Sequence, residues 1–220
     1  MEEKEKNEIY RYLKLECGDE SKKLEDKFFE LANYLMNDVW LVVAGKQYKM
    51  TELEIYYSDK DSDKKEHVDP YVHCADEQRS VGKWYFNGSG LDITFGEYVY
   101  GGILIRGIVE RGTKKHINGS SNVLKEIFFN MRDVYTDKGG FCLQVRTPEE
   151  KQASEKPIRT VRIGLTKKDD DNEKFYEKEY RYIIDLNLEH KFKDKEAVIK
   201  ALFSDREKRK EIMGYYIKDV

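Results

Sequence analysis

The stretch from Gln47 to Ile108 constrains the fold more strongly than any other part of the chain. Between Tyr48 and Tyr57, polar and apolar residues alternate, which is the period of a half-buried strand. Two further segments, 84–95 and 101–108, are rich in β-branched and aromatic residues and are punctuated by glycine. Segments of this kind, joined by turns, predict neighbouring strands of one sheet.

Amphipathic helices are expected on both sides of this stretch. Leu24, Phe28, Leu31 and Leu35 recur on one helical face, which predicts a helix over 22–36 capped by Ser21. A further helix is predicted through Met131, with Ser120 or Ser121 as its N-cap. The other predicted elements are a hairpin of 39–44 and 47–57, a hairpin of 84–86 and 91–95, strands at 103–109, 141–146, 159–165 and 180–186, and helices at 197–203 and 206–216. The chain predicts one α+β domain over 1–220, with 1–20 as a charged extension.

Composition limits the class of protein. Aromatic residues make up 13% of the chain, which argues for a packed core and against disorder. The net charge is -3, so strong non-specific DNA binding is not indicated. Three cysteines without a CxxC pair predict reduced thiols. Because no secretory h-region and no membrane-length apolar run is visible, we expect a soluble, cytoplasmic protein.

Common cofactor and metal motifs are missing from the sequence. It contains no GxGxxG after a strand, no GxxxxGK[ST] and no HExxH. His67 and His73-Cys74 could supply metal ligands, but their spacing fits no standard site. We therefore expect neither a cofactor nor a metal.

One strand carries the candidate chemistry. Alternation places Met50, Glu52, Glu54 and Tyr56 on one face, toward solvent or a cleft, while Leu53 belongs to the buried face.

Arg106 lies in a later apolar strand, where an unpaired charge is costly. It should therefore meet an acidic group or a ligand anion. Two interpretations stay open: a structural pair of Arg106 with a glutamate, or a pocket formed by a carboxylate and aromatic rings.

The order of the segments resembles the methylpurine (3-methyladenine-type) DNA glycosylase family. Glu52-Leu53-Glu54-Ile55-Tyr56 matches the family's E-T-E-A-Y segment, and an aspartate-rich loop follows it. Collinear matches then run over roughly 190 residues, at 82–87, 101–107, 119–128, 162–165 and 180–184. The resemblance implies a curved sheet or partial barrel flanked by helices.

The resemblance also implies roles for individual residues. Glu54 falls on the water-activating glutamate, Tyr56 on an aromatic that stacks against a flipped base, and Arg106 on the arginine beside the active site. The pocket histidine is His67 or His73, and the opposite stacking wall is Trp84 or Phe86.

A hairpin that faces DNA in the family has its tip at Asn87, Gly88 and Ser89 here, followed by Gly90. These residues provide no large aromatic wedge, so insertion of a base into a pocket is better supported than intercalation into the duplex.

The implied function is hydrolysis of the N-glycosidic bond of alkylated purines in base-excision repair. A carboxylate can stabilise the oxocarbenium-like sugar and activate water, and the base must leave the stack to reach it. Damaged DNA or a modified nucleobase is the expected partner, with no membrane and, for a repair enzyme, association with the nucleoid. The alternatives are a non-catalytic nucleotide- or nucleic-acid-binding module on the same scaffold, and a structural or partner-binding protein.

Overall fold

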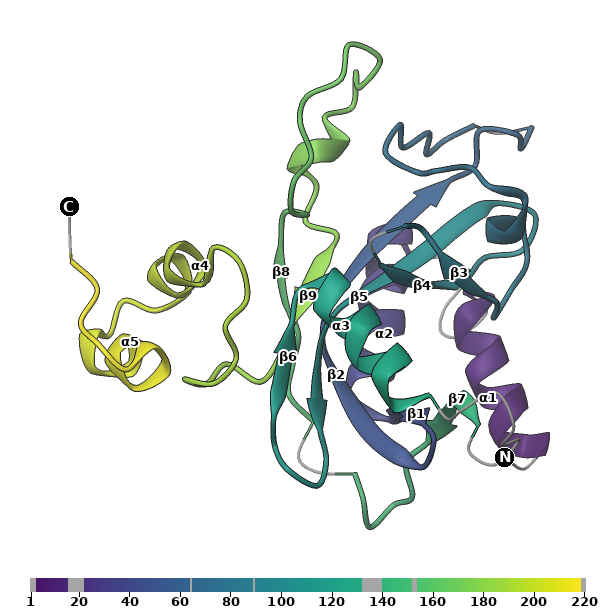
Figure 1. The fold of residues 1–220 in the computed structure, drawn as a ribbon. Coiled ribbons are helices and arrows are strands. Elements are labelled where there is room, and N and C mark those ends of the chain that lie inside the picture. The colour runs from purple at the N-terminus through teal and green to yellow at the C-terminus, as the bar shows by residue number, and fades with distance from the viewer. Residues whose placement is uncertain are drawn as a thin grey trace.

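Nine strands form one sheet in the computed structural model, which describes residues 3–15, 22–63, 65–88, 90–131, 140–151 and 154–218. The strands are β1 (Val39–Val43), β2 (Lys46–Ser58), β3 (Trp84–Phe86), β4 (Leu91–Thr94), β5 (Tyr100–Glu110), β6 (His116–Asn118), β7 (Phe141–Val145), β8 (Ile158–Thr160) and β9 (Arg181–Ile183). Their main order is β3-β4-β5-β2-β1-β7, with β6 on β5 and the β8–β9 pair on β2. The pairings of these strands are antiparallel, and the sheet curls into a half-barrel (Figure 1). The predicted α+β class and its antiparallel sheet are confirmed.

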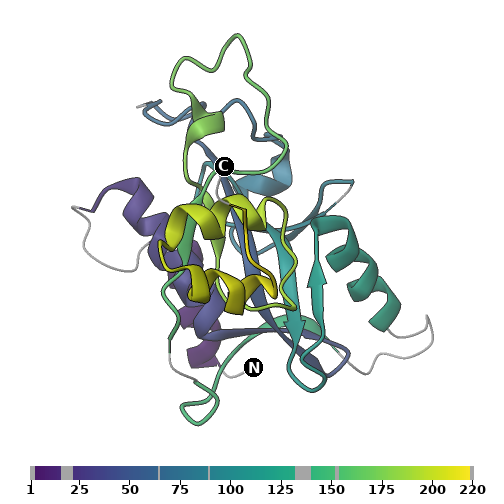
Figure 2. The ribbon, with the colours of Figure 1, turned by 90° about the vertical axis from the view of Figure 1, so that its left-hand side faces the viewer.

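Five α-helices surround this sheet in the described residues. They are α1 (Glu3–Leu13), α2 (Leu24–Asn37), α3 (Ser120–Asn130), α4 (Lys195–Leu202) and α5 (Arg206–Met213), with two short 3-10 helices, η1 (Asp76–Arg79) and η2 (Phe175–Glu177). The α4–α5 pair lies beside β8 and β9, apart from the other helices, and faces the viewer in Figure 2. It encloses a small apolar core of its own, made of Ile199, Ile212, Met213 and Ile217.

The main core lies between α2 and the sheet. Phe28, Leu31 and Leu35 on α2 are fully buried, as are Leu53 and Ile55 on β2. The predicted helical stripe and the predicted apolar face of the strand therefore pack against each other. Because side chains alternate along a strand, the residues between Leu53 and Ile55 face the other side of the sheet.

Several element boundaries differ from the predicted ones. Helix α2 begins at Leu24 with Lys23 as its N-cap, and the predicted cap Ser21 lies outside the described residues. Helix α3 is capped by Gly119, whose φ of 91° ends the preceding strand, so the prediction of a serine cap was wrong. The predicted strands at 159–165 and 180–186 are shorter, because the chain leaves the sheet after Thr160 and Ile183.

A double irregularity in the pairing of β2 with β5 changes which side chains share a face. The register shifts between Met50 and Glu52, and again between Glu52 and Leu53. Thr51 is the extra residue on β2, and Arg106 is the extra residue on β5. Met50 is consequently in the core with Leu53, so the prediction that Met50 shares a face with Glu52 was wrong.

Gly101 should be intolerant of any side chain. A Cβ at this position of β5 would overlap the backbone carbonyl oxygen of Phe95, which cannot move aside as a flexible side chain would. Gly101→Ala is expected to lower the free energy of unfolding by about 1–3 kcal/mol. Gly112→Ala is the control, because a Cβ there meets nothing within 4 Å. Urea denaturation measures both, and equal stability of the two variants would contradict the prediction.

Candidate functional site

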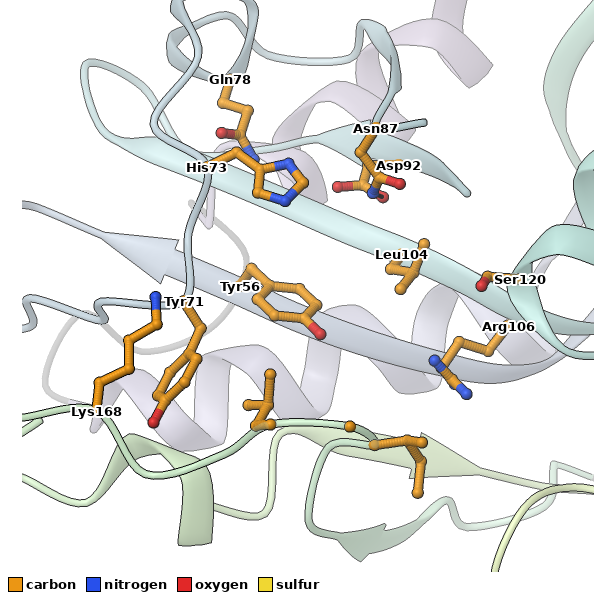
Figure 3. Close-up of a pocket in the computed structure, with 13 residues that line it drawn as sticks. Tyr56, Tyr71, His73, Gln78, Asn87, Asp92, Leu104, Arg106, Ser120 and Lys168 are labelled. Carbon is orange, nitrogen blue, oxygen red and sulfur yellow. Dashed lines mark hydrogen bonds between the residues drawn. The ribbon is translucent and has the colours of Figure 1, made fainter. Parts of the chain in front are cut away.

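A cavity of about 440 Å³ opens on the face of β2 and β5 that lies opposite the core (Figure 3). Strands β2, β4 and β5 supply its floor, and loops supply its walls. The lining residues are Tyr56, Tyr71, His73, Gln78, Asn87, Asp92, Leu104, Arg106, Ser120, Ile163, Gly164, Leu165 and Lys168. A concave site with a few convergent polar groups is the usual form of a ligand site.

Glu54 lies beneath the floor of this cavity with its carboxylate fully buried. The hydroxyl of Tyr56 donates to its Oε2 at 2.9 Å, and the backbone N–H of Ile163 donates to its Oε1 at 2.7 Å. Arg106 Nε is 3.4 Å from the same Oε1. Since Tyr56 and Arg106 line the cavity, one side chain separates Glu54 from a ligand in it.

Glu52 anchors two arginines on the same face of the sheet. Its Oε1 accepts from Arg106 Nε at 3.0 Å and from Arg181 Nε at 2.7 Å. Glu52 and Arg181 are both almost completely buried. Two carboxylates thus face two guanidinium groups, which offsets the cost of burying these charges.

The environment of Glu54 suits a proton acceptor. Burial raises the pKa of its carboxyl group, while Arg106, the N–H of Ile163 and the hydroxyl of Tyr56 oppose that rise. A carboxylate whose pKa is raised is a stronger base than an exposed one, and Arg106 favours its ionised form.

Asp92 on β4 is a second buried carboxyl group at the cavity. Its Oδ1 accepts from Asn87 Nδ2 at 2.7 Å, and its Oδ2 packs over Gly102, where a Cβ would come within 2.8 Å of it. Burial raises the pKa of Asp92 to about 7; the charge of Glu54 adds to the rise, and the hydrogen bond from Asn87 opposes it. Asp92 was not among the predicted site residues. The signal that could have found it is a single acidic residue in the otherwise apolar segment 91–95.

Arg162 fixes two aromatic rings of the cavity and was also missed as a site residue. Its guanidinium carbon lies 4.5 Å from the ring centre of Tyr56 and 5.7 Å from that of Tyr71. The side chain is buried and donates to Asp69 Oδ2 at 2.7 Å. The sequence predicted a strand at 159–165 and a family match at 162–165, but no site role for Arg162.

The structure separates the two candidate histidines. His73 lines the cavity, and its Nδ1 is 3.4 Å from the hydroxyl of Tyr85. His67 lies in the core among aromatic rings, including those of Phe28 and Phe175. Burial, followed by the charge of Lys178, lowers the pKa of His67 to about 4.

The aromatic and hairpin candidates also take different places. Trp84 stacks on Phe141 with ring centres 4.2 Å apart and lines a separate cavity of about 250 Å³ beside α1. Phe86 is half exposed and stacks on Phe128 of α3. Of the hairpin tip, Asn87 lines the cavity over β2 and β5, Gly88 makes the turn with a φ of 79°, and Ser89 lies outside the described residues.

Comparison with known proteins gives one informative similarity. No protein-family model matches the chain. The chain is similar to "Uncharacterized protein L759" of Acanthamoeba polyphaga mimivirus, with 29% identity over 198 residues that cover 73% of this chain and 87% of the viral protein. The similarity therefore covers most of both chains, and the description of the viral protein names no activity.

The described residues contain neither a membrane-length apolar helix nor a cluster of metal ligands. No helix in them has the length and apolar character needed to cross a bilayer. No group of three or more histidine, cysteine, aspartate or glutamate side chains in them is arranged to hold a metal ion.

The protonation of Asp92 should make stability depend on pH. Its pKa rises from an ordinary 3.8 to about 7 in the fold, so between these values the folded state holds a proton that the unfolded chain has lost. Stability contributed by this proton is present below pH 3.8 and is lost as the pH rises through about 7. Asp92→Asn cannot titrate and should become the more stable protein above pH 7, by about 4 kcal/mol.

Chemical denaturation of both proteins at intervals from pH 4 to pH 8 measures this difference. Asp63→Asn, in an exposed loop, is the control and should follow the wild type. A difference between Asp92→Asn and wild type that does not change with pH would contradict the prediction.

Proposed function

We propose that this protein is a DNA glycosylase that hydrolyses the N-glycosidic bond of damaged purines, with alkylated purines as the expected class. The observation that supports it best is the contact of Arg106 and Tyr56, at the floor of a cavity of about 440 Å³, with the buried carboxylate of Glu54 beneath them. In this proposal the modified base enters the cavity and the sugar lies at its mouth. Glu54 then takes a proton from the attacking water, directly or through the hydroxyl of Tyr56.

The walls of the cavity are suited to a planar ring. Tyr56, Tyr71 and His73 place three aromatic side chains around it, on β2 and on the loop that follows β2 (Figure 3). Asn87 and Gln78 add amide groups that can hydrogen-bond to the edge of a base. An aromatic wall with a few polar groups is typical of a site that reads an extruded nucleobase.

The pair of exposed rings beside the cavity supports DNA as the substrate. Phe86 and Phe128 are each about half exposed, with ring centres 5.7 Å apart and planes at 18°. Phe86 directly precedes Asn87, which lines the cavity. Bases that have left the duplex stack readily on such rings. The pair is thus positioned to hold the neighbouring nucleotide.

A second candidate is a non-catalytic module that binds a nucleotide or a nucleic acid. The complete burial of Glu54 favours it, because both of its oxygens already contact protein groups. In that case the glutamate only holds Arg106 and Tyr56 in position, and the cavity binds a base without turnover.

Replacement of Glu54 distinguishes these functions. Wild-type protein should release methylated purines from alkylated duplex DNA, and Glu54→Gln should lower the rate at least 100-fold by removing the proton acceptor. Chromatography of the released bases measures the rate. Glu52→Gln is the matched control, since Glu52 is equally buried and contacts the same Arg106.

Glu52→Gln should lower the free energy of unfolding by on the order of 3 kcal/mol, yet retain base release at temperatures where circular dichroism shows it folded. Equal loss of release in both variants would contradict a specific role for Glu54. A wild-type protein that binds modified bases or oligonucleotides without releasing any base would select the binding module.

Replacement of Phe86 tests the DNA-facing surface. Phe86→Ala should weaken binding to duplex DNA with one abasic site by about 1–3 kcal/mol, the contribution of one stacked base. Fluorescence anisotropy measures the affinity. Tyr215→Ala removes an equally exposed ring in the segment that follows α5 and should leave the affinity unchanged. If both variants bind as wild type does, DNA does not contact the Phe86–Phe128 pair.

A further inference from the structure

The two end strands of the half-barrel meet at a seam beside α1. Strands β3 and β7 are the two ends of the main strand order. Trp84 of β3 stacks on Phe141 of β7, with ring centres 4.2 Å apart and planes at 20°. In the described chain β3 pairs with β4 and β7 pairs with β1, so these rings, and not backbone hydrogen bonds, bridge the seam. Helix α1 lies against β7 on this side of the sheet (Figure 1).

A cavity of about 250 Å³ remains at this seam, and we call it the seam cavity. Its lining is mostly apolar and comes from α1, β3, β4, β7 and the segment before β3. The residues are Lys6, Ile9, Tyr10, Leu13, Val81, Gly82, Lys83, Trp84, Ile93, Phe141, Cys142 and Leu143. An apolar cavity of about 150 Å³ stays dry and binds benzene, so a cavity of about 250 Å³ can hold a ligand of about ten non-hydrogen atoms.

The face that α1 presents to the cavity follows from its sequence. Lys6, Ile9, Tyr10 and Leu13 recur at intervals of three and four residues, so they share one side of the helix. Ile9 and Leu13 are buried, whereas Lys6 is exposed. The helix therefore adds apolar groups to the interior of the seam cavity and a cation to its solvent side.

Two lysines give the seam cavity a positive mouth. Lys6 and Lys83 line it and are both exposed, and neither ammonium group forms an ion pair within the described part of the chain. Among the described residues that line the cavity, none is acidic. An anionic group at the mouth would be attracted by both lysines, while a cationic group would be repelled.

We propose that the seam cavity binds a small apolar carboxylate of about ten non-hydrogen atoms. Its apolar part fills the space beside Trp84 and Phe141, where burial of apolar surface favours binding. Its carboxylate lies between Lys6 and Lys83 and can accept hydrogen bonds from both, because it has two oxygens. The seam cavity shares no lining residue with the cavity over β2 and β5, so this proposal does not depend on the glycosylase function.

Three probes that share one apolar chain and differ in the head group test the proposal. They are octanoate, octan-1-ol and octylamine, each titrated into the wild-type protein in a calorimeter below its micelle concentration. Octanoate should bind about 5-fold more tightly than octan-1-ol, the gain expected from exposed ion pairs with the two lysines. Octylamine should bind most weakly, because its ammonium group meets two cations.

Tryptophan fluorescence locates the bound probe. The chain has two tryptophans, so Trp40→Phe leaves Trp84 as the emitter at the seam cavity. Octanoate should change the Trp84 emission saturably, with the affinity that calorimetry gives. Val81→Phe places a ring in the cavity and should abolish binding of all three probes. Circular dichroism confirms the folding of each variant.

Removal of the lysine charges tests the head-group selection. Lys83→Met keeps an apolar stem of similar length and should lower the preference for octanoate over octan-1-ol, and Lys6→Met with Lys83→Met should abolish it. The affinity for octan-1-ol should stay unchanged in both. Lys125→Met, at an exposed lysine of α3, is the matched control and should keep the wild-type preference.

Each part of the proposal has an outcome that overturns it. Absence of saturable binding for every probe, or undiminished binding by folded Val81→Phe, overturns the site. Octanoate binding no tighter than octan-1-ol or octylamine overturns the carboxylate class, as does an unchanged preference in the double lysine variant. These measurements use no DNA, so their failure and the failure of the glycosylase function are separate results.

Discussion

The buried charges of Glu52, Glu54, Arg106 and Arg181 set the conditions under which this sheet can form. Ions in a protein interior cost several kcal/mol each unless they are paired with good geometry. Glu52 meets both arginines within 3.0 Å, and Glu54 shares Arg106. These residues come from β2, β5 and β9, so the three strands must pair in one register to neutralise the charges. The network therefore fixes the floor of the cavity before any ligand arrives.

The register shift at Thr51 reconciles this network with the apolar core. Without it, strict alternation would turn Met50 toward the charged face together with Glu52. One extra residue on each strand, Thr51 on β2 and Arg106 on β5, returns Met50 to the core and leaves Arg106 pointing at the glutamates. Gly107 makes this possible, because a Cβ there would come within 2.8 Å of the Thr51 hydroxyl oxygen. Bulges of this kind commonly aim a side chain at a site.

Local patterns predicted the elements well and the site only in part. Alternation and turn glycines suffice for the β1–β2 and β3–β4 hairpins, since both signals are local. Nothing local distinguishes His67 from His73, because each lies in a loop without periodicity. Only the fold shows that His67 is buried in the core and that His73 lines the cavity. Asp92 is buried at the cavity because β4 pairs with β5, and this tertiary contact cannot be read from the local sequence. The bulge was invisible for the same reason, since β2 alternates without a break in sequence.

The chemical difference between Glu54 and Asp92 arises from one neighbour each. Both acids are buried, both flank Leu104, and each alone would resist ionisation. A guanidinium beside Glu54 favours its anion, whereas an amide beside Asp92 supplies only a neutral dipole. Two acids in identical surroundings would resist ionisation equally, so the two different neighbours give Glu54 and Asp92 different protonation behaviour. The scaffold obtains it from two side chains, Arg106 and Asn87, on opposite sides of one leucine.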